Sequence, residues 1–238
     1  MIFQKVVYAI IVMVFLFAAG LVAQPYDYPI KPGMPEWKAM TSTEQRVQAC
    51  QIPDSILSKM STSDLLETCL RFPFNLNLVA FNQIQDGFNA IKKESNGWRE
   101  LLQRKDLGSV VINKYSTMNP DSMISEQYPG HDFLVMETLL KQNEVINTLP
   151  KDDRIKLLKE SYKKYTGKIQ YPEKYAFFGV INNIALMGKI LTIENYEPFV
   201  QSIMNKKGLK NKIELGSQCT KDESNEILKH VEKFIKEN

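Results

Sequence analysis

The 238-residue sequence lacks the short motifs that mark the commonest catalytic and cofactor-binding sites. It contains no HExxH zinc-binding pair, no GxSxG nucleophile turn, no CxxC pair and no glycine-rich phosphate loop. Its eleven glycines are scattered rather than grouped in a nucleotide-binding pattern. We therefore expect no cofactor, no metal site and none of the activities that depend on those motifs.

Cysteine and net charge are also scarce. Three cysteines are too few for a disulfide-dense scaffold, and an oxidising compartment would pair two of them at most. Cys50 and Cys69 lie close in sequence on neighbouring predicted helices and are the natural pair, although lone cysteines often act as small buried hydrophobic residues. The net charge of +3 gives no reason to expect nucleic-acid binding.

Only one hydrophobic run is long, and it stands at the start of the chain. Lys5 is followed by eighteen uncharged residues, from Val6 to Ala23, that end in small side chains. Such a start is typical of a secretory signal peptide, here 1–23, with cleavage after Gly20 or Ala23. The alternative is an uncleaved anchor, because eighteen residues at about 1.5 Å each can just span a bilayer. We expect an exported protein, periplasmic or extracellular, with a soluble body.

Proline is concentrated in the segment that follows, 24–40. Four prolines there restrict the backbone and predict an extended strap. Tyr26, Tyr28, Ile30 and Trp37 are spaced so that they can pin this strap to the body. The strap is either a packed N-terminal arm or a docking segment for a partner.

Beyond residue 40 the pattern is all-α. Apolar residues recur at helical spacing, and period-two alternation of β-branched residues is nearly absent. The helices predicted are about ten, at 41–50, 53–60, 64–71, 75–93, two within 98–115, 132–148, 152–165, 175–191, 196–205 and 223–236. Thr41 with Glu44, and Ser61 with Asp64, have the spacing of capping boxes.

Short connections predict antiparallel helix pairs within one helical domain, 41–238. The loop 116–130, rich in Pro, Asp, Ser and Gly, is the possible subdomain boundary. The helix 175–191 is the most apolar and is predicted to be central. The pairs form either an irregular bundle or a degenerate superhelical array with helical-repeat-like spacing.

The two histidines are weak candidates for chemistry. His131 precedes Asp132 at a predicted helix start, where the acid either orients a base or simply caps the helix. A nucleophilic thiol beside His131 is not expected, because Cys50 and Cys69 lie on apolar helix faces. His230 follows Glu226 by four residues, a spacing that suits a metal-binding pair but is commoner in a solvated surface pair.

Two surface patterns are candidate binding sites. Four tyrosines run through a lysine-rich helical hairpin and suit either stacking on a sugar or peptide, or ordinary packing of the hairpin. A basic loop around Gly208 suits either contact with an anionic surface or plain solvation. The candidate residues are Tyr162, Tyr165, Tyr171 and Tyr175 in the first pattern and Lys206, Lys207 and Lys210 in the second.

Three stretches in the first half of the body resemble a group of uncharacterised exported proteins from bacteria of the Bacteroides type. They are YPIKPGMPEWKAM, CQIPDSILSKMSTSDLLETCL and NGWRELLQRKDLGS. The resemblance implies export and bacterial origin, and it implies no activity and no site residue.

The function predicted from these observations is binding. We expect a binding or scaffold module of the cell envelope, with an unknown envelope protein or glycan as partner and with membrane contact only through an uncleaved signal. The alternative is an extracytoplasmic hydrolase whose catalytic carboxylates no motif singles out.

Overall fold

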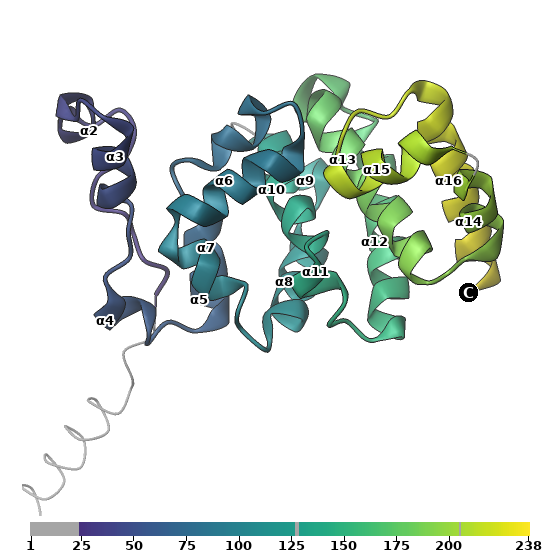
Figure 1. Cartoon of the computed structure of the whole chain (residues 1–238), viewed down its shortest axis with the longest axis horizontal. Coiled ribbons are helices and arrows are strands. Elements are labelled where there is room, and N and C mark those ends of the chain that lie inside the picture. Colours follow the sequence, from purple (N-terminus) through teal and green to yellow (C-terminus); the bar gives the residue numbers. More distant parts are fainter. Residues whose placement is uncertain (1–23, 127–128, 205) are drawn as a thin grey trace, which may run out of the picture.

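In the computed structural model, the described part of the chain comprises residues 24–126, 129–204 and 206–238 (Figure 1). The predicted signal peptide, 1–23, lies outside the described residues. Within that part, every regular element is a helix and none is a strand, which confirms the all-α prediction.

The helices of the first half are α2 (Pro35–Ala39), α3 (Thr43–Ala49), α4 (Asp54–Leu57), α5 (Thr62–Leu70), the 3₁₀ helix η1 (Asn75–Ala80), α6 (Ile84–Glu94), α7 (Asn96–Leu101) and α8 (Leu107–Thr117). Those of the second half are α9 (Pro120–Met123), α10 (Pro129–Leu140), α11 (Asn143–Ile146), α12 (Lys151–Lys168), α13 (Pro172–Ile193), α14 (Glu197–Met204), α15 (Lys207–Leu215) and α16 (Lys221–Glu237).

The chain advances along the long axis of the molecule. Helices α2 to α4 lie at one end, α14 and α16 lie at the other, and α10 and α13 lie between them (Figure 1). The lengths of the helices range from 4 residues in α4 to 22 in α13, so successive units are not equivalent.

Helix α13 is the hub of the second half. It packs against α10, α12, α14, α15 and α16, as expected for the most apolar predicted helix. Only Glu173, Lys174 and Lys189 are charged among its 22 residues, and a helix that is apolar on all sides is buried by its neighbours. No helix in the described ranges has the length and apolarity needed to cross a bilayer.

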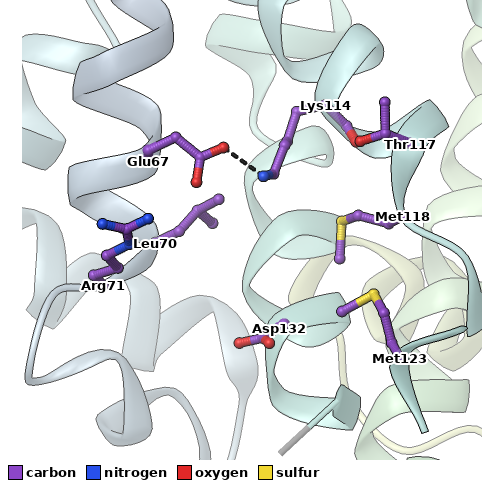
Figure 2. A pocket seen from close by; sticks show the side chains of 8 residues that line it. All are labelled: Glu67, Leu70, Arg71, Lys114, Thr117, Met118, Met123 and Asp132. Carbon is purple, nitrogen blue, oxygen red and sulfur yellow. Dashed lines mark hydrogen bonds and ion pairs between the residues drawn. The ribbon is translucent and has the colours of Figure 1, made fainter. Parts of the chain in front are cut away.

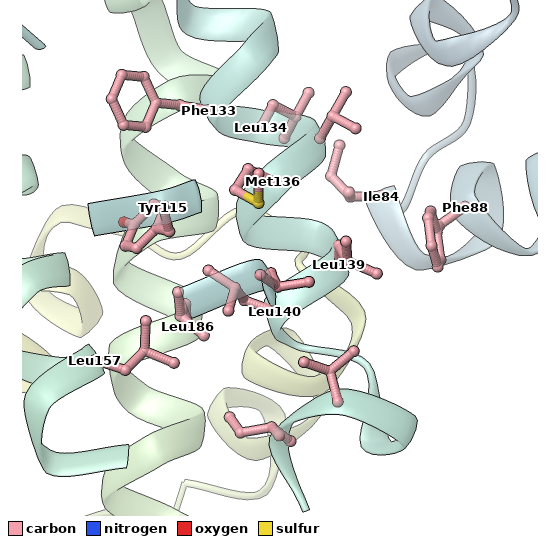
Figure 3. Packing of buried hydrophobic residues seen from close by; sticks show 14 of the residues in the cluster. Ile84, Phe88, Tyr115, Phe133, Leu134, Met136, Leu139, Leu140, Leu157 and Leu186 are labelled. Atoms are coloured by element: carbon pink, nitrogen blue, oxygen red, sulfur yellow. The ribbon is translucent and has the colours of Figure 1, made fainter. Parts of the chain in front are cut away.

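One hydrophobic core runs through the body, from Tyr28 to Phe234. Figure 3 shows its middle, where side chains from α6, α8, α10, α12 and α13 meet. Burying a Leu, Ile or Phe side chain fully contributes about 1.5–3 kcal/mol, so this core supplies the main stabilisation. The core continues across the loop 116–130, because α10 packs against α5 and α6 as well as α13.

The predicted helix 75–93 is two elements in the structure, η1 and α6. Phe81 is extended between them, and α6 folds back onto η1. Gly87 permits this fold, since a Cβ atom there would lie 2.7 Å from the carbonyl oxygen of Leu78. The single-helix prediction was therefore wrong, because periodicity does not reveal a close approach of two backbones.

The predicted helix 132–148 is also divided, into α10 and α11. The break lies at Gln142, whose backbone is extended. Its side-chain amide donates to the carbonyl oxygen of Thr138 at 2.8 Å and exchanges hydrogen bonds of 3.1 Å with the Gln85 amide. A tertiary contact with α6 thus holds the break in place.

The residues predicted to form a basic loop, 206–212, belong mostly to helix α15. Leu209 and Ile213, four residues apart, are completely buried and anchor this helix. Gly208 does not end it, and the helix instead stops at Gly216, which adopts φ +63° at the C-cap. The loop prediction was wrong because Gly208 is tolerated in the first turn of a helix.

The proline-rich segment follows its prediction only in part. Residues 24–34 are not helical, but Pro35 begins the short helix α2, a position where its missing N–H costs nothing. Tyr28 is buried, and the Tyr26 N–H donates to Thr68 Oγ1 at 2.8 Å. The segment is therefore packed against α5.

Two capping boxes were predicted near the N-terminus. Ser61 caps α5 by accepting from the Asp64 N–H, as expected. The other box is formed by Ser42 with Gln45, one residue later than the predicted Thr41 with Glu44. Both candidates fit the pattern, and the helix begins at the later one.

All three cysteines are buried free thiols in this structure, and the candidate pair Cys50 and Cys69 is not joined by a disulfide there. Cys69 on α5 packs against α7, because a Cβ atom on Gly97 of α7 would lie 3.4 Å from its Sγ. Burial raises the pKa of the Cys50 and Cys219 thiols to about 11. The thiols therefore act as small hydrophobic residues, the alternative considered from the sequence.

Candidate functional site

Two adjoining hollows lie around the C-terminal end of α8. The first measures about 300 Å³ and the second about 560 Å³. Both are lined by Thr117, the last residue of α8, and by Met118, which follows it. We call the two hollows together the groove, and its walls come from α5, α8, α9, α10 and α12.

The first hollow has both apolar and charged lining, with Leu70 on one side and Met118 and Met123 on the other (Figure 2). We call these three apolar side chains the floor. The charged residues that line the hollow are Glu67, Arg71, Lys114 and Asp132. Residues three and four apart share one face of a helix, so Glu67, Leu70 and Arg71 all reach the hollow from α5.

Only two of these four charges are paired with each other. Lys114 Nζ forms an ion pair with the Glu67 carboxylate across the top of the hollow (Figure 2). The Arg71 side chain makes no hydrogen bond or ion pair with the described residues. The nearest cationic partner recorded for Asp132 among them is His131, whose Nδ1 lies 3.8 Å from Oδ1. One cation and one anion therefore remain open to a ligand.

The histidine beside this hollow does not form a catalytic pair. The separation of 3.8 Å between His131 and Asp132 exceeds a hydrogen bond. Helix α10 begins at Pro129, so Asp132 lies in its first turn and does not cap it, contrary to one prediction. None of the three cysteines is among the described residues that line either hollow.

The second hollow is lined mainly by polar side chains. They are Ser116, Thr117, Asn119, Asp121, Glu160, Lys163, Lys164, Thr166 and Gln170. Close packing of α9 on α12 shapes this hollow, since a Cβ atom on Gly167 would lie 3.2 Å from the Pro120 ring. Hydroxyl, amide and charged groups here offer both donors and acceptors to a ligand.

Lys164 lines the second hollow, and its amine also contacts a buried side chain of the core. Its side chain is only 4% exposed, and Nζ donates to Glu160 Oε2 at 3.1 Å. The same Nζ lies 4.7 Å from the centre of the Tyr115 ring. Burial lowers the pKa of Lys164, while the Glu160 carboxylate opposes that change. Tyr115 in turn donates to Glu137 Oε1 at 2.8 Å, deep in the core.

A buried ion pair lies behind this wall of the groove. Lys168 Nζ donates to Glu137 Oε1 at 2.5 Å and to the carbonyl oxygen of Gly179 at 2.8 Å. Burial raises the pKa of Glu137 and lowers that of Lys168, and their mutual attraction works against both changes. The pair joins α10, α12 and α13, so its role is to hold the helices that carry the groove.

A second buried amine, Lys141, lies one helical turn beyond Glu137. It is 2% exposed, and Nζ has no hydrogen-bond partner among the described residues. A Cβ atom on Gly216 would lie 2.7 Å from Nζ. Burial and the Lys189 ammonium lower the pKa of Lys141 to about 7, while the Glu214 carboxylate acts in the opposite direction.

The predicted tyrosine stripe is not one continuous surface. Tyr175 is buried, and its hydroxyl donates to the carbonyl oxygen of Pro120. Tyr162 and Tyr165 stack with ring centres 6.3 Å apart, and the Tyr162 hydroxyl donates to Glu232 on α16 at 2.8 Å. Tyr171 is half-buried at the start of α13. Tyr175 therefore cannot stack on a ligand, and binding by the other three stays a prediction.

The predicted lysine site is placed at the junction of α14 and α15. Lys206 and Lys210 are exposed, whereas the side chain of Lys207 lies outside the described part of the structure. Lys210 lines a separate, more apolar hollow with Ile203 and Met204. Neither Lys206 nor Lys210 is among the residues that line the groove, and contact of these lysines with an anionic surface stays a prediction.

The pair His230 and Glu226 is partly buried rather than solvated. Their Nε2 and Oε1 atoms lie 3.1 Å apart, and His230 packs beside the rings of Tyr196 and Phe199. The ranges described above contain no group of three or more His, Cys, Asp or Glu side chains placed to hold a metal ion.

Comparison of the chain with models of protein families, with characterised proteins and with solved structures finds no match. The resemblance to exported Bacteroides-type proteins therefore stays a prediction.

Most groove residues were not singled out in the sequence. The sequence marks Asp132 only as a partner of His131 or as a helix cap, and it marks Lys163 and Lys164 only as lysines of the tyrosine-bearing hairpin. Arg71 and Glu67 carried no signal, because charged residues on one face of a short helix are normally solvated. Their significance depends on residues of α8 and α10 that face them.

Proposed function

We propose that this chain is an exported binding protein that holds an extended ligand in the groove. The observation that carries the proposal is the meeting of the two hollows at Thr117 and Met118. A ligand that lies across these residues contacts an apolar floor at one end and a polar wall at the other. Ligand sites typically combine such apolar surface with a few polar groups that set orientation.

The two ends of the groove favour a peptide over a glycan. Sugars are commonly held by stacking on aromatic rings, and no aromatic side chain is among the described residues that line either hollow. A peptide instead offers an apolar side chain to Leu70 and Met118. Its backbone amides can exchange hydrogen bonds with side chains such as Asn119 and Gln170.

A hydrolase is the second candidate, and one observation favours it. Asp121 on α9 and Glu160 on α12 both line the second hollow, and paired carboxylates are the usual groups for glycoside cleavage. Glu160 already accepts a hydrogen bond from Lys164, however, so it is engaged in the resting structure. If the wild type hydrolysed an envelope glycan and Asp121→Asn did not, the protein would be a hydrolase rather than a binding protein.

The binding proposal is tested by filling the junction of the two hollows. Thr117→Trp places a large ring where both hollows meet, and Asn225→Trp places the same ring at an exposed position of α16, outside both hollows. The protein and both variants are screened by thermal shift against a panel of short peptides and of envelope glycan fragments. Hydrogen exchange then maps any ligand that raises the melting temperature.

We expect at least one ligand to stabilise the wild type and Asn225→Trp but not Thr117→Trp, and to protect amides of α8 and α12. A glycan that does so would retain the binding proposal and replace the peptide. Ligands that stabilise Thr117→Trp as strongly as the wild type would overturn the assignment of the groove.

A further inference from the structure

The first hollow presents one open cation and one open anion above an apolar floor. Arg71 and Asp132 line it from α5 and α10, while the other two charges, Glu67 and Lys114, satisfy each other (Figure 2). A ligand that enters this hollow therefore meets a guanidinium group and a carboxylate with which it can pair. This arrangement of charges favours a ligand that carries both signs of charge.

Each open charge stands where its own helix favours it. Arg71 is the C-cap of α5, where the helix dipole is negative, and Asp132 lies in the first turn of α10, where it is positive. Both groups are therefore stable in the absence of a ligand. The backbone of each residue is held at a helix end, and both side chains are exposed.

The floor between them accepts an aliphatic side chain. Leu70, Met118 and Met123 supply only carbon and sulfur atoms, and methionine adapts readily to ligands of different shape. The volume of about 300 Å³ is at the lower end of the usual range for ligand sites. The ligand is therefore small.

We infer that the first hollow binds a short peptide with both termini free. Its terminal carboxylate pairs with Arg71, its terminal ammonium pairs with Asp132, and an aliphatic side chain rests on the floor. A simple anion such as a fatty acid would leave Asp132 without a partner, and a simple cation would leave Arg71 without one. This inference rests on the proposed function, since it names the ligand of one end of the groove.

The test uses the dipeptide leucyl-leucine and two blocked forms, its C-terminal amide and its N-acetyl derivative, measured by calorimetry or NMR titration. Each blocked form lacks one of the two charges. We expect the free dipeptide to bind the wild type at least 10-fold more tightly than either blocked form. Arg71→Gln is expected to remove the preference over the amide only, and Asp132→Asn to remove the preference over the N-acetyl form only.

Matched controls are available elsewhere in the chain. Arg99 is an exposed arginine in the last turn of α7, and Asp222 is an exposed acid in the first turn of α16. Arg99→Gln and Asp222→Asn are expected to keep both preferences. Circular dichroism and melting curves confirm that all four variants fold, because the replaced side chains are exposed.

The possible failures are distinguishable. Equal affinity for the free and blocked dipeptides, or preferences that survive in both groove variants, would overturn the inference while the groove remains a binding site. Absence of dipeptide binding, together with another ligand that Thr117→Trp excludes, would overturn the inference and keep the proposed function. Absence of every ligand from the groove would overturn both.

Discussion

Lys168 Nζ lies 2.5 Å from Glu137 Oε1, and neither side chain is exposed to solvent. This ion pair joins α10 to α12 behind the second hollow, and Tyr115 adds a hydrogen bond from α8. The cost of removing two charges from water is large. The hydrogen bonds from Tyr115 to Glu137 and from Lys168 to Gly179 offset part of it, while Glu137 Oε2 has no partner among the described residues. The ion pair sets the relative position of three of the helices that form the groove.

Breaking this pair is expected to be strongly destabilising. Lys168→Met leaves the Glu137 carboxylate buried without its cation, and the free energy of unfolding should fall by about 3–5 kcal/mol. The double variant Lys168→Met with Glu137→Leu should lose less, since no charge is then left alone. Urea unfolding measures both, with exposed Lys159→Met as the control. A loss no larger than that of the control would show that the pair is not buried.

The stability should depend on pH through Lys141. The pKa of this amine is lowered to about 7 in the folded protein, whereas an unfolded lysine titrates near 10.4. Between these values the unfolded chain holds one more proton, so the folded state gains stability as the pH rises. Below about pH 7 both states are protonated, and this contribution no longer changes.

Comparison with Lys141→Met isolates that contribution, because the tyrosine and cysteine titrations cancel in the difference. The free energy of unfolding of the wild type relative to this variant should rise by about 2–3 kcal/mol between pH 7 and pH 9. Denaturant unfolding at several pH values measures it. If the free energy of unfolding changed equally with pH in the wild type and in Lys141→Met, the pKa of Lys141 would not be lowered in the folded protein.

Two glycines should respond to alanine in opposite ways. A Cβ atom at Gly87 would meet the backbone of Leu78 at 2.7–2.8 Å, so Gly87→Ala should destabilise the packing of α6 on η1. Nothing lies within 4 Å of a Cβ atom at Gly208 in the first turn of α15, so Gly208→Ala should stabilise by about 0.5 kcal/mol. Melting temperatures of the two variants test both expectations. A Gly87→Ala variant as stable as the wild type would contradict the close approach of Gly87 to the Leu78 backbone.

The three thiols should be unreactive in the folded protein. All are buried, and burial raises the pKa of Cys50 and Cys219 to about 11, so little thiolate forms near pH 8. Titration with a thiol reagent should detect few thiols in the native state and three after denaturation. A denatured protein with one reactive thiol, and a mass reduced by two hydrogens, would reveal the Cys50–Cys69 disulfide.

Export is tested by the N-terminus of the native protein. Cleavage after Gly20 or Ala23 should leave a first residue of Leu21 or Gln24. Intact mass and N-terminal sequencing of the native protein distinguish the two. A chain that still begins at Met1 in membrane fractions would instead support the uncleaved anchor.

The helical class and most helix positions could be predicted from local patterns. Apolar spacing located α12, α13 and α16, and Ser61 marked the start of α5. Most failures come from packing contacts, between neighbouring as well as distant elements, that apolar spacing does not reveal. Gly87 against Leu78 and Gln142 against Gln85 divide two predicted helices, and burial of Leu209 turns a predicted loop into α15.

The groove was less predictable than the fold. Lysines near the predicted tyrosine stripe, Lys163 and Lys164, do line the second hollow, but the stripe itself is interrupted because Tyr175 is buried. Nothing local marked Arg71 as a residue of interest. An exposed arginine at a helix end has the same sequence signature whether it faces open solvent or another helix across a hollow.

The sequence by itself determined the helical class, the single long apolar run at the start of the chain and the apolar character of α13, because each follows from residues that are neighbours along the chain. Only the tertiary structure decided that Arg71 and Asp132 line one hollow and that Glu137 meets Lys168. Those pairs lie on different helices, and which helices meet depends on the packing of the whole core.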